Sequence, residues 1–140
     1  MSNNLNNISP IDGRYSKITK ELTNYFSESA LIKYRVFIEI QYLIHLSKID
    51  IIVFKSVSQK DRKKIEAIYH DLSIKDIKRI KKIESVTNHD VKAVEYFLKE
   101  KFDQLKLGNI KEFIHFGLTS QDINNTASPL LLKDYLQNYF

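Results

Sequence analysis

Residues 87–102 read TNHDVKAVEYFLKEKF, and the pattern of this stretch decides the fold class. Its apolar residues recur at spacings of three and four, which predicts a helix that buries one side. Thr87 precedes Asp90 by three residues, the spacing of a helix N-cap and its reciprocal acidic partner. The stretch therefore predicts an amphipathic helix that begins just after Thr87.

The first turn of this predicted helix carries Asn88 and His89. Backbone N–H groups there have no partner inside the helix, and the helix dipole is positive at that end. An amide and an imidazole in this place can hold a carboxylate or phosphate, or transfer a proton. An ordinary cap with a structural histidine explains the same residues, and the stretch alone favours that interpretation because the T-x-x-D pattern is common.

The composition is that of a globular, helical protein. Of the 140 residues, 43% are hydrophobic and 28% are charged, which suits one domain with its own core. Only 3 Gly and 2 Pro are present, which favours helices over a β-sandwich. Cys is absent, which excludes disulfides, thiolate catalysis and Cys-based zinc sites. The sequence also lacks an apolar signal core and a run of roughly 18 apolar residues, so we expect a soluble, cytoplasmic protein.

The net charge of +5 raises the question of a nucleic-acid partner. Many of the basic residues lie between residues 60 and 82, where Asp and Glu are interspersed along helical patterns. No fingerprint, glycine loop or aromatic platform of an RNA-binding module is recognisable. The pattern favours a solvated helix face over a nucleic-acid surface.

A long helix is expected from Ser27 to about Ile49. Its buried stripe is predicted to consist of Leu31, Tyr34, Ile38, Tyr42 and His45, broadened by Phe37, Ile40 and Ile44. We interpret His45 as a surface or packed histidine rather than a ligand. Shorter helices are predicted at residues 17–25, after Ser58, after Ser73 and at residues 123–140, with a loop at residues 50–57. Pro129 falls inside the last of these and is expected to kink it or displace a hydrogen bond.

The pattern of Ser or Thr followed three residues later by Asp occurs five times, at Ser9, Ser58, Ser73, Thr87 and Thr119. A pattern this frequent marks helix starts and not active sites. Two further places nevertheless offer anion-binding chemistry. The turn at residues 9–13 presents Arg14, which could clamp a phosphate, and Tyr15, although a surface Arg beside a packed Tyr is the favoured alternative. Thr119 caps the last predicted helix and leaves the hydroxyl of Ser120 at its positive end.

Four segments, taken in order, resemble the N-terminal portion of the adenylosuccinate lyase family, a branch of the fumarase/aspartase superfamily. They are SPIDGRY at 9–15, FSESALIKYRVFIEIQYL at 26–43, TNHDVKAVEYFLKEKF at 87–102 and EFIHFGLTSQDINNTA at 112–127. The ordered set, more than any one segment, carries the resemblance. Its Gly-Arg-Tyr and Asn-His-Asp sequences fit this branch better than the argininosuccinate lyases. The resemblance spans nearly the whole chain, which corresponds to about the first third of such an enzyme.

The resemblance implies an all-α fold and a specific reaction. Residues 1–110 would form the helical N-terminal domain, and residues 111–140 the start of a central helical bundle that assembles a homotetramer. The family cleaves adenylosuccinate to AMP and fumarate in purine biosynthesis. It also cleaves succinyl-aminoimidazole-carboxamide ribotide to the carboxamide ribotide and fumarate. The reaction is a β-elimination that uses no metal and no organic cofactor.

The resemblance also implies which residues bind the nucleotide substrate: Arg14, Tyr15, Asn88, His89, Asp90, Thr119 and Ser120. The Arg-Tyr pair would contact the phosphate region and the Thr-Ser pair the anionic groups of the substrate. The family's general acid, a histidine in a Thr-His-Gly context, is absent from this chain, as is the loop with the serine base. We therefore expect the acid and base beyond Phe140, no catalytic residue within the chain, and a truncated chain that is inactive by itself. The alternative is a small basic helical module that binds RNA or a protein partner.

Overall fold

The computed structural model describes residues 7–49 and 57–139, and all regular structure in those two ranges is helical. The predicted all-α class is confirmed. The loop predicted at residues 50–57 lies outside the described residues, apart from Val57. The helices are η1 (Lys20–Leu22), α1 (Thr23–Phe26), α2 (Glu28–Leu46), α3 (Gln59–His70), α4 (Ile74–Thr87), α5 (Asp90–Gln104), η2 (Lys111–Phe113) and α6 (Ser120–Tyr139).

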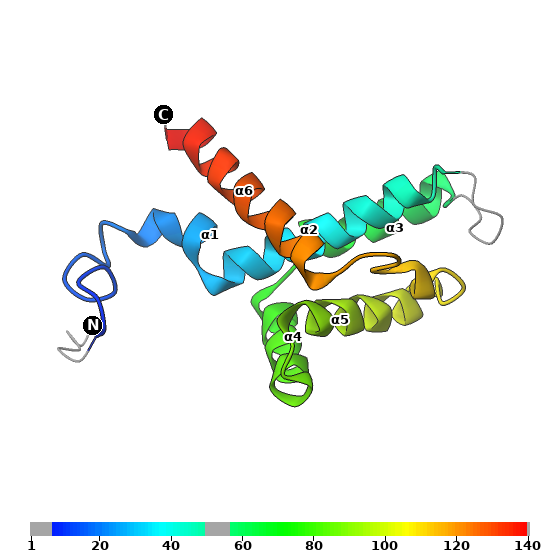
Figure 1. The fold of residues 1–140 in the computed structure, drawn as a ribbon, viewed down its shortest axis with the longest axis horizontal. Helices are drawn as coiled ribbons and strands as arrows, with labels where there is room; N and C mark the ends of the chain where they lie inside the picture. The colour runs from blue at the N-terminus through cyan, green and yellow to red at the C-terminus, as the bar shows by residue number, and fades with distance from the viewer. Residues whose placement is uncertain (1–6, 50–56, 140) are drawn as a thin grey trace.

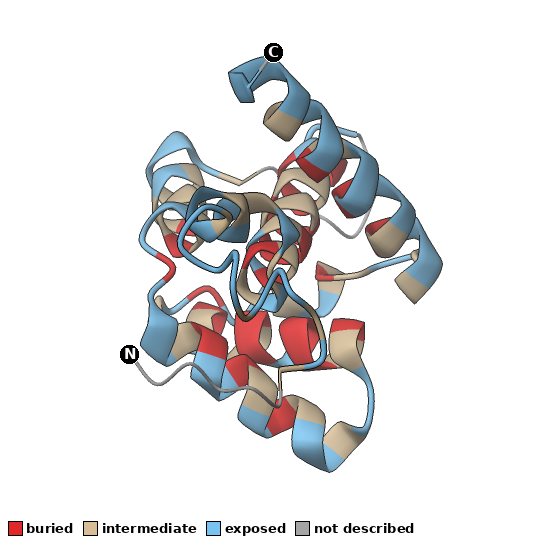
Figure 2. Ribbon diagram, turned by 90° about the vertical axis from the view of Figure 1, so that its left-hand side faces the viewer, coloured by how far each residue is buried: buried red, intermediate tan, exposed pale blue. Residues whose placement is uncertain are grey.

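Helix α2 is the element against which the others pack. It contacts α1, α3, α5 and α6, while α4 packs chiefly on α5. Figure 1 shows α6 crossing α2 and the α4–α5 pair lying on another side of it. The core between them is aliphatic and aromatic, as in Val36, Ile40, Ile80, Phe97 and Phe102, each at most 1% exposed. Figure 2 shows that the buried positions of the chain gather on the sides of the helices that face one another.

The stripe predicted for α2 is correct only in part. Leu31, Tyr34, Ile38 and Tyr42 are only half-buried, and His45 is exposed. The fully buried face is formed by Ile32, Val36, Ile40, Leu43 and Ile44, of which only Ile40 and Ile44 belong to the predicted broadened stripe. The reason is that α2 is covered from several sides, so an apolar–polar division along one stripe does not describe it. The two tyrosines point to the C-terminal part of the chain, where Tyr34 donates to Asp134 (2.7 Å) and Tyr42 to the Phe116 carbonyl (2.8 Å).

Two of the predicted helix starts are confirmed by their cap geometry. The Ser58 hydroxyl oxygen accepts the backbone N–H of Asp61 at 3.1 Å at the start of α3. At the start of α4, Ser73 and Asp76 form a reciprocal capping box, with backbone-to-side-chain distances of 3.0 and 3.3 Å. Each cap satisfies N–H groups that the first helical turn leaves unpaired.

Asp76 stabilises this helix start only while it is ionised. Burial alone would raise the pKa of its carboxyl, but hydrogen bonds from Lys101 and Ser73 lower it to about 2, against an ordinary value of 3.8. Because the folded-state pKa is the lower one, the stabilisation is present above pH 3.8 and is lost as the pH falls toward 2. We expect Asp76→Asn to lower the urea-unfolding free energy at neutral pH, with a gap to the wild type that narrows in acid. A gap independent of pH would contradict this account.

The last helix, α6, follows its predicted cap and runs through its proline. It begins at Ser120, directly after the predicted cap Thr119 and three residues before Ile123, and Pro129 lies inside it without ending the helical span. It packs on α2 and α1. Among the described helices, none combines the length and the apolar character that a membrane crossing requires.

Candidate functional site

The junction between α4 and α5 places two candidate residues on a tight backbone turn. Thr87 ends α4, so the prediction that it caps α5 is wrong. Asn88 follows in the left-handed region (φ 53°, ψ 30°), with its N–H on the Glu84 carbonyl at 2.8 Å. Asparagine tolerates this conformation, which stops α4 at once. His89 is then the N-cap residue of α5, and its Nδ1 accepts the Lys92 N–H at 3.1 Å.

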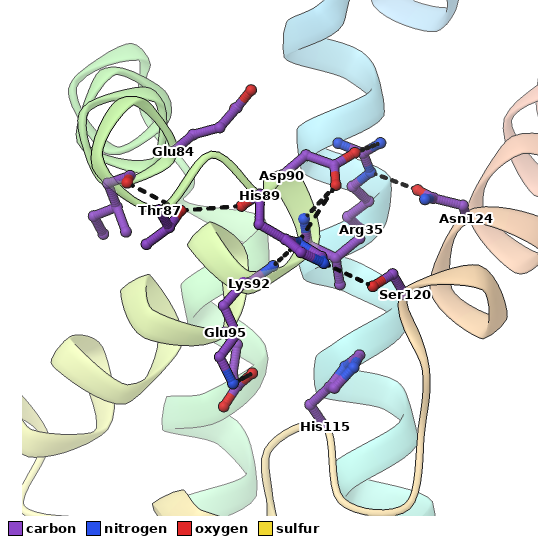
Figure 3. Close-up of polar contacts among 12 residues, drawn as sticks. Arg35, Glu84, Thr87, His89, Asp90, Lys92, Glu95, His115, Ser120 and Asn124 are labelled. Atoms are coloured by element: carbon purple, nitrogen blue, oxygen red, sulfur yellow. Dashed lines mark hydrogen bonds and ion pairs between the residues drawn. The ribbon is translucent and has the colours of Figure 1, made fainter.

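This cap determines the tautomer of His89. Because Nδ1 accepts an N–H, it is unprotonated, and the neutral ring carries its proton on Nε2. Nε2 lies 3.2 Å from the hydroxyl oxygen of Ser120, 31 residues further along the chain. Figure 3 shows the imidazole directed at Ser120 across the gap between α5 and α6. The first residues of two helices, each with a positive N-terminal dipole, therefore meet at one hydrogen bond.

Asp90, the residue after the cap, is held by a buried arginine of α2. Its Oδ2 lies 2.6 Å from Nη2 of Arg35, and its Oδ1 accepts the Val91 N–H at 2.8 Å. The Nε of Arg35 donates to Oδ1 of Asn124 on α6 at 2.9 Å (Figure 3). The Arg35 residue is only 8% exposed. One guanidinium therefore fixes the starts of α5 and α6 relative to α2.

Thr119 serves as a local cap at the start of α6. Asp122 accepts both its backbone N–H at 2.7 Å and its hydroxyl at 2.9 Å. These bonds lower the pKa of the Asp122 carboxyl below its ordinary value. With the Thr119 hydroxyl occupied, the adjacent Ser120 hydroxyl is the one that faces His89.

An open pocket of about 440 Å³ adjoins the α4–α5 junction. Its lining residues are Lys81, Glu84, Ser85, Asn88, His89 and Asp90. Lys81 is paired with Glu28 and Glu84, so the positive end of α5 is the feature of this pocket that suits an anionic group. In the part of the chain that the structure describes, His, Asp and Glu nowhere form a group of three or more suited to a metal ion.

Arg14 and Tyr15 do not reach this junction within one chain. Both are exposed, and the Arg14 guanidinium lies over the Tyr15 ring at 4.9 Å from its centroid. Figure 1 places their turn at one end of the molecule, beyond α1 and apart from the α4–α5 corner. The structure therefore brings together the sites around His89 and Ser120, and leaves the Arg-Tyr pair separate.

Besides the contact of His89 with Ser120, the structure contains a polar contact between His115 and Glu39 that was not predicted from the sequence. Nδ1 of His115, on the connector before α6, lies 2.6 Å from Oε1 of Glu39 on α2. The Glu39 side chain is completely buried. The available signal was the spacing of Arg35 and Glu39, four residues apart in an otherwise apolar run, which places both on one face of α2. Two charges on a buried helix face require partners from elsewhere in the fold.

The buried Glu39 carboxyl gives a pH-dependent stability. Burial raises its pKa above the ordinary 4.5, and the hydrogen bond to His115 offsets this only in part. The other charged groups nearby are Glu95 of α5, itself paired with Lys92 and Lys99, and Arg35 on α2. Because the folded-state pKa is the higher one, ionisation of Glu39 opposes folding above that pKa, and the opposition disappears as the pH falls toward 4.5.

We therefore expect Glu39→Gln to have a higher unfolding free energy than the wild type at neutral pH. The gap should shrink as the pH falls, because the wild-type carboxyl then becomes neutral as well. Urea unfolding of both proteins at a series of pH values measures this difference in unfolding free energy. A variant that is less stable than the wild type at neutral pH, with a gap that grows in acid, would refute the assignment.

Comparison with known proteins identifies the class. Residues 13–139 match the lyase family, so this chain belongs to that family. Its curated relatives include the adenylosuccinate lyase of Dictyostelium discoideum, 52% identical over 139 residues, which cover 96% of this chain and 30% of the relative. The adenylosuccinate lyase of Buchnera aphidicola (subsp. Acyrthosiphon pisum) is 48% identical over 129 residues, which cover 91% of this chain and 28% of the relative. The adenylosuccinate lyase of Escherichia coli is 45% identical over 128 residues, which cover 90% of this chain and 28% of the relative.

These relatives confirm the resemblance that the four ordered segments indicated. The chain spans about 30% of the length of the relatives that it matches.

Proposed function

We propose that this chain is the N-terminal part of a lyase that cleaves adenylosuccinate to AMP and fumarate. The same site would cleave succinyl-aminoimidazole-carboxamide ribotide to the carboxamide ribotide and fumarate. The observation that carries the proposal is the contact of His89 with Ser120, where the starts of α5 and α6 meet. Similarity to proteins named adenylosuccinate lyase supports the choice of substrate.

The chemistry of these substrates suits this arrangement. Both carry a phosphate and two carboxylates, and helix N-termini favour anions. The imidazole N–H of His89 and the hydroxyl of Ser120 can each donate to a carboxylate or phosphate oxygen once substrate replaces their mutual contact. Asn88 and Thr119 shape the two helix starts, and Asp90 fixes its helix through Arg35.

In a β-elimination, a base removes the proton beside a carboxylate and an acid protonates the departing nitrogen. We assign neither step to a residue of this chain. Its residues bind and orient the substrate, and the acid and base come from the part of the lyase beyond Phe140. No metal or organic cofactor is required by this scheme.

The complete lyase is proposed to be a cytoplasmic homotetramer, with residues 1–110 as its N-terminal domain and residues 111–140 as the start of the central bundle. Exposed apolar side chains on α6 support its place in a bundle formed with other subunits. Three of them are 42–47% exposed in the single chain: Leu132, Leu136 and Tyr139. A site shared between subunits also gives Arg14 and Tyr15 a place in it, despite their distance from His89 within one chain. Their proposed contact is the substrate phosphate.

The alternative of a basic binding module has weaker support. Several of the basic residues between 60 and 82 are engaged by carboxylates: Arg62 by Glu66, Lys64 by Asp61, Arg79 by Glu100 and Lys81 by Glu84. Neutralisation of this kind weakens a phosphate-binding surface.

Fumarate release tests the proposal. The complete lyase is expected to release fumarate from both substrates, whereas residues 1–140 alone release none because they lack the acid and the base. Both proteins would be assayed at equal concentration, with folding of the short chain checked by circular dichroism. Fumarate release by folded residues 1–140, or its absence from the complete lyase with either substrate, would contradict the proposal.

A further inference from the structure

We propose that Glu39 is a positioning residue: its buried carboxylate accepts the Nδ1–H of His115 and thereby aims Nε2 of that ring at bound substrate. The inference rests on the proposed function, because His115 has a substrate to meet only if the chain forms part of the lyase. His115 lies on the connector that leads into α6, and Figure 3 shows Ser120 where that connector joins the helix.

The hydrogen bond determines the chemistry of the ring. The Nδ1–Oε1 distance is 2.6 Å, and an ionised carboxylate can only accept. With Glu39 ionised, as the proposal holds, Nδ1 donates and the neutral ring has an unprotonated Nε2. The Glu39 side chain is 0% exposed, whereas that of His115 is 16% exposed. One edge of the imidazole is thus fixed inside the protein, and the ring still reaches the surface.

The backbone around His115 is held by the same helix. His115 has a φ of 61°, in the left-handed region that is unfavourable for a non-glycine residue. Such a conformation persists where surrounding contacts over-determine it. Tyr42 of α2 supplies one of these contacts, since its hydroxyl donates to the carbonyl of Phe116 at 2.8 Å. Glu39, less than one turn earlier on α2, supplies the other through the His115 ring.

The other oxygen of Glu39 indicates that the contact is not optimised for stability. Among the residues that the structure describes, Oε2 is buried and has no hydrogen-bond partner. A buried carboxylate with one oxygen unpaired opposes folding, and burial raises its pKa accordingly. Groups perturbed in this way concentrate at functional sites, where orientation of a reacting or binding group outweighs stability.

A parallel contact lies one turn earlier on the same face of α2. Arg35 fixes Asp90 of α5 and Asn124 of α6, as Glu39 fixes His115. Four residues separate the two charges, so both point in the same direction from the helix. In this arrangement α2 supports the starts of α5 and α6 and the connector. The residues there that face away from α2 can contact substrate.

The experiment has a spectroscopic part and a kinetic part. Histidine ring nitrogens of the ¹⁵N-labelled 140-residue chain are assigned by NMR in the wild type, Glu39→Gln, Glu39→Leu and the control Glu95→Gln. Glu95 is also a buried carboxylate, at 5% exposure, but its ion-pair partners are Lys92 and Lys99 instead of His115. The wild type and the control should show the proton of neutral His115 on Nδ1. Glu39→Gln should retain it because Gln Oε1 can accept, and Glu39→Leu should lose it.

In the complete lyase, Glu39→Leu should lower kcat/KM by about 100-fold through misplacement of the ring. Glu39→Gln should recover most of that loss, and Glu95→Gln should stay near the wild type. Equal losses of kcat/KM in Glu39→Leu and Glu95→Gln would overturn the proposal, because they would indicate a general effect of removing a buried charge. If Glu39→Leu does not fold, the wild-type spectrum still decides, because a proton on Nε2 of neutral His115 would overturn the proposal. A lyase without fumarate release would refute the proposed function and leave the spectroscopic result to stand independently.

Discussion

Replacing Phe97 by alanine is expected to lower the unfolding free energy of this chain by about 3–5 kcal/mol. Phe97 lies on α5, is 1% exposed and belongs to the hydrophobic core between the helices. Truncation removes apolar contacts and leaves a cavity that the neighbouring helices can fill only in part. A typical domain has about 5–15 kcal/mol in total, so urea unfolding should show a large shift of the midpoint.

The adjacent Tyr96 is the matched control. It lies on the same helix but is 41% exposed, so Tyr96→Ala should change the unfolding free energy by no more than about 0.5 kcal/mol. If the two alanine variants lost similar stability, the buried side of α5 would be assigned incorrectly.

His89→Asn is expected to separate the structural role of His89 from its functional one. Asparagine is among the best N-cap residues, so the start of α5 and the overall stability should be preserved. The imidazole N–H that donates to substrate is lost. A hydrogen bond to a charged group contributes about 1.5–3 kcal/mol, which corresponds to a decrease in kcat/KM of about 10- to 150-fold in the complete lyase.

His89→Ala serves as the comparison, because it removes the cap as well as the imidazole. It should lose kcat/KM to a similar extent and also about 1 kcal/mol of stability. Steady-state kinetics and urea unfolding of both variants would be measured together. Full kcat/KM in His89→Asn would mean that His89 acts only as a cap, the interpretation that the residue pattern alone had favoured.

The parts of the fold that depend on local sequence could be predicted. The starts of α3 and α4 follow from Ser58 and Ser73, whose hydroxyls act on residues three positions away. The same spacing gave a wrong N-cap at Thr87. Asn88, in the left-handed conformation, ends α4 there, so that His89 becomes the N-cap of α5. A backbone conformation of this kind is not encoded in the Ser/Thr-x-x-Asp pattern.

Contacts between distant segments could not be predicted in the same way. Periodicity assigned one stripe to α2, but this helix is covered by neighbours on several sides, so its tyrosines are half-buried and make polar contacts. The contact of Glu39 with His115 spans 76 residues, and no local signal pairs them.

The candidate site was predicted in part through the family resemblance. His89 and Ser120 were both named, and the structure places them in contact. Asp90 was also named, but its buried partner Arg35 was not. Arg14 and Tyr15 remain apart from them, and their place at the substrate stays a prediction.

The central claim is that the starts of α5 and α6 together bind the substrate's anionic groups, and a crystal structure of the complete lyase with AMP and fumarate tests it most directly. The account predicts that an oxygen of one of these ligands accepts hydrogen bonds from Nε2 of His89 and the hydroxyl of Ser120, replacing their present 3.2 Å contact. Ligands bound elsewhere, with that contact intact, would contradict it.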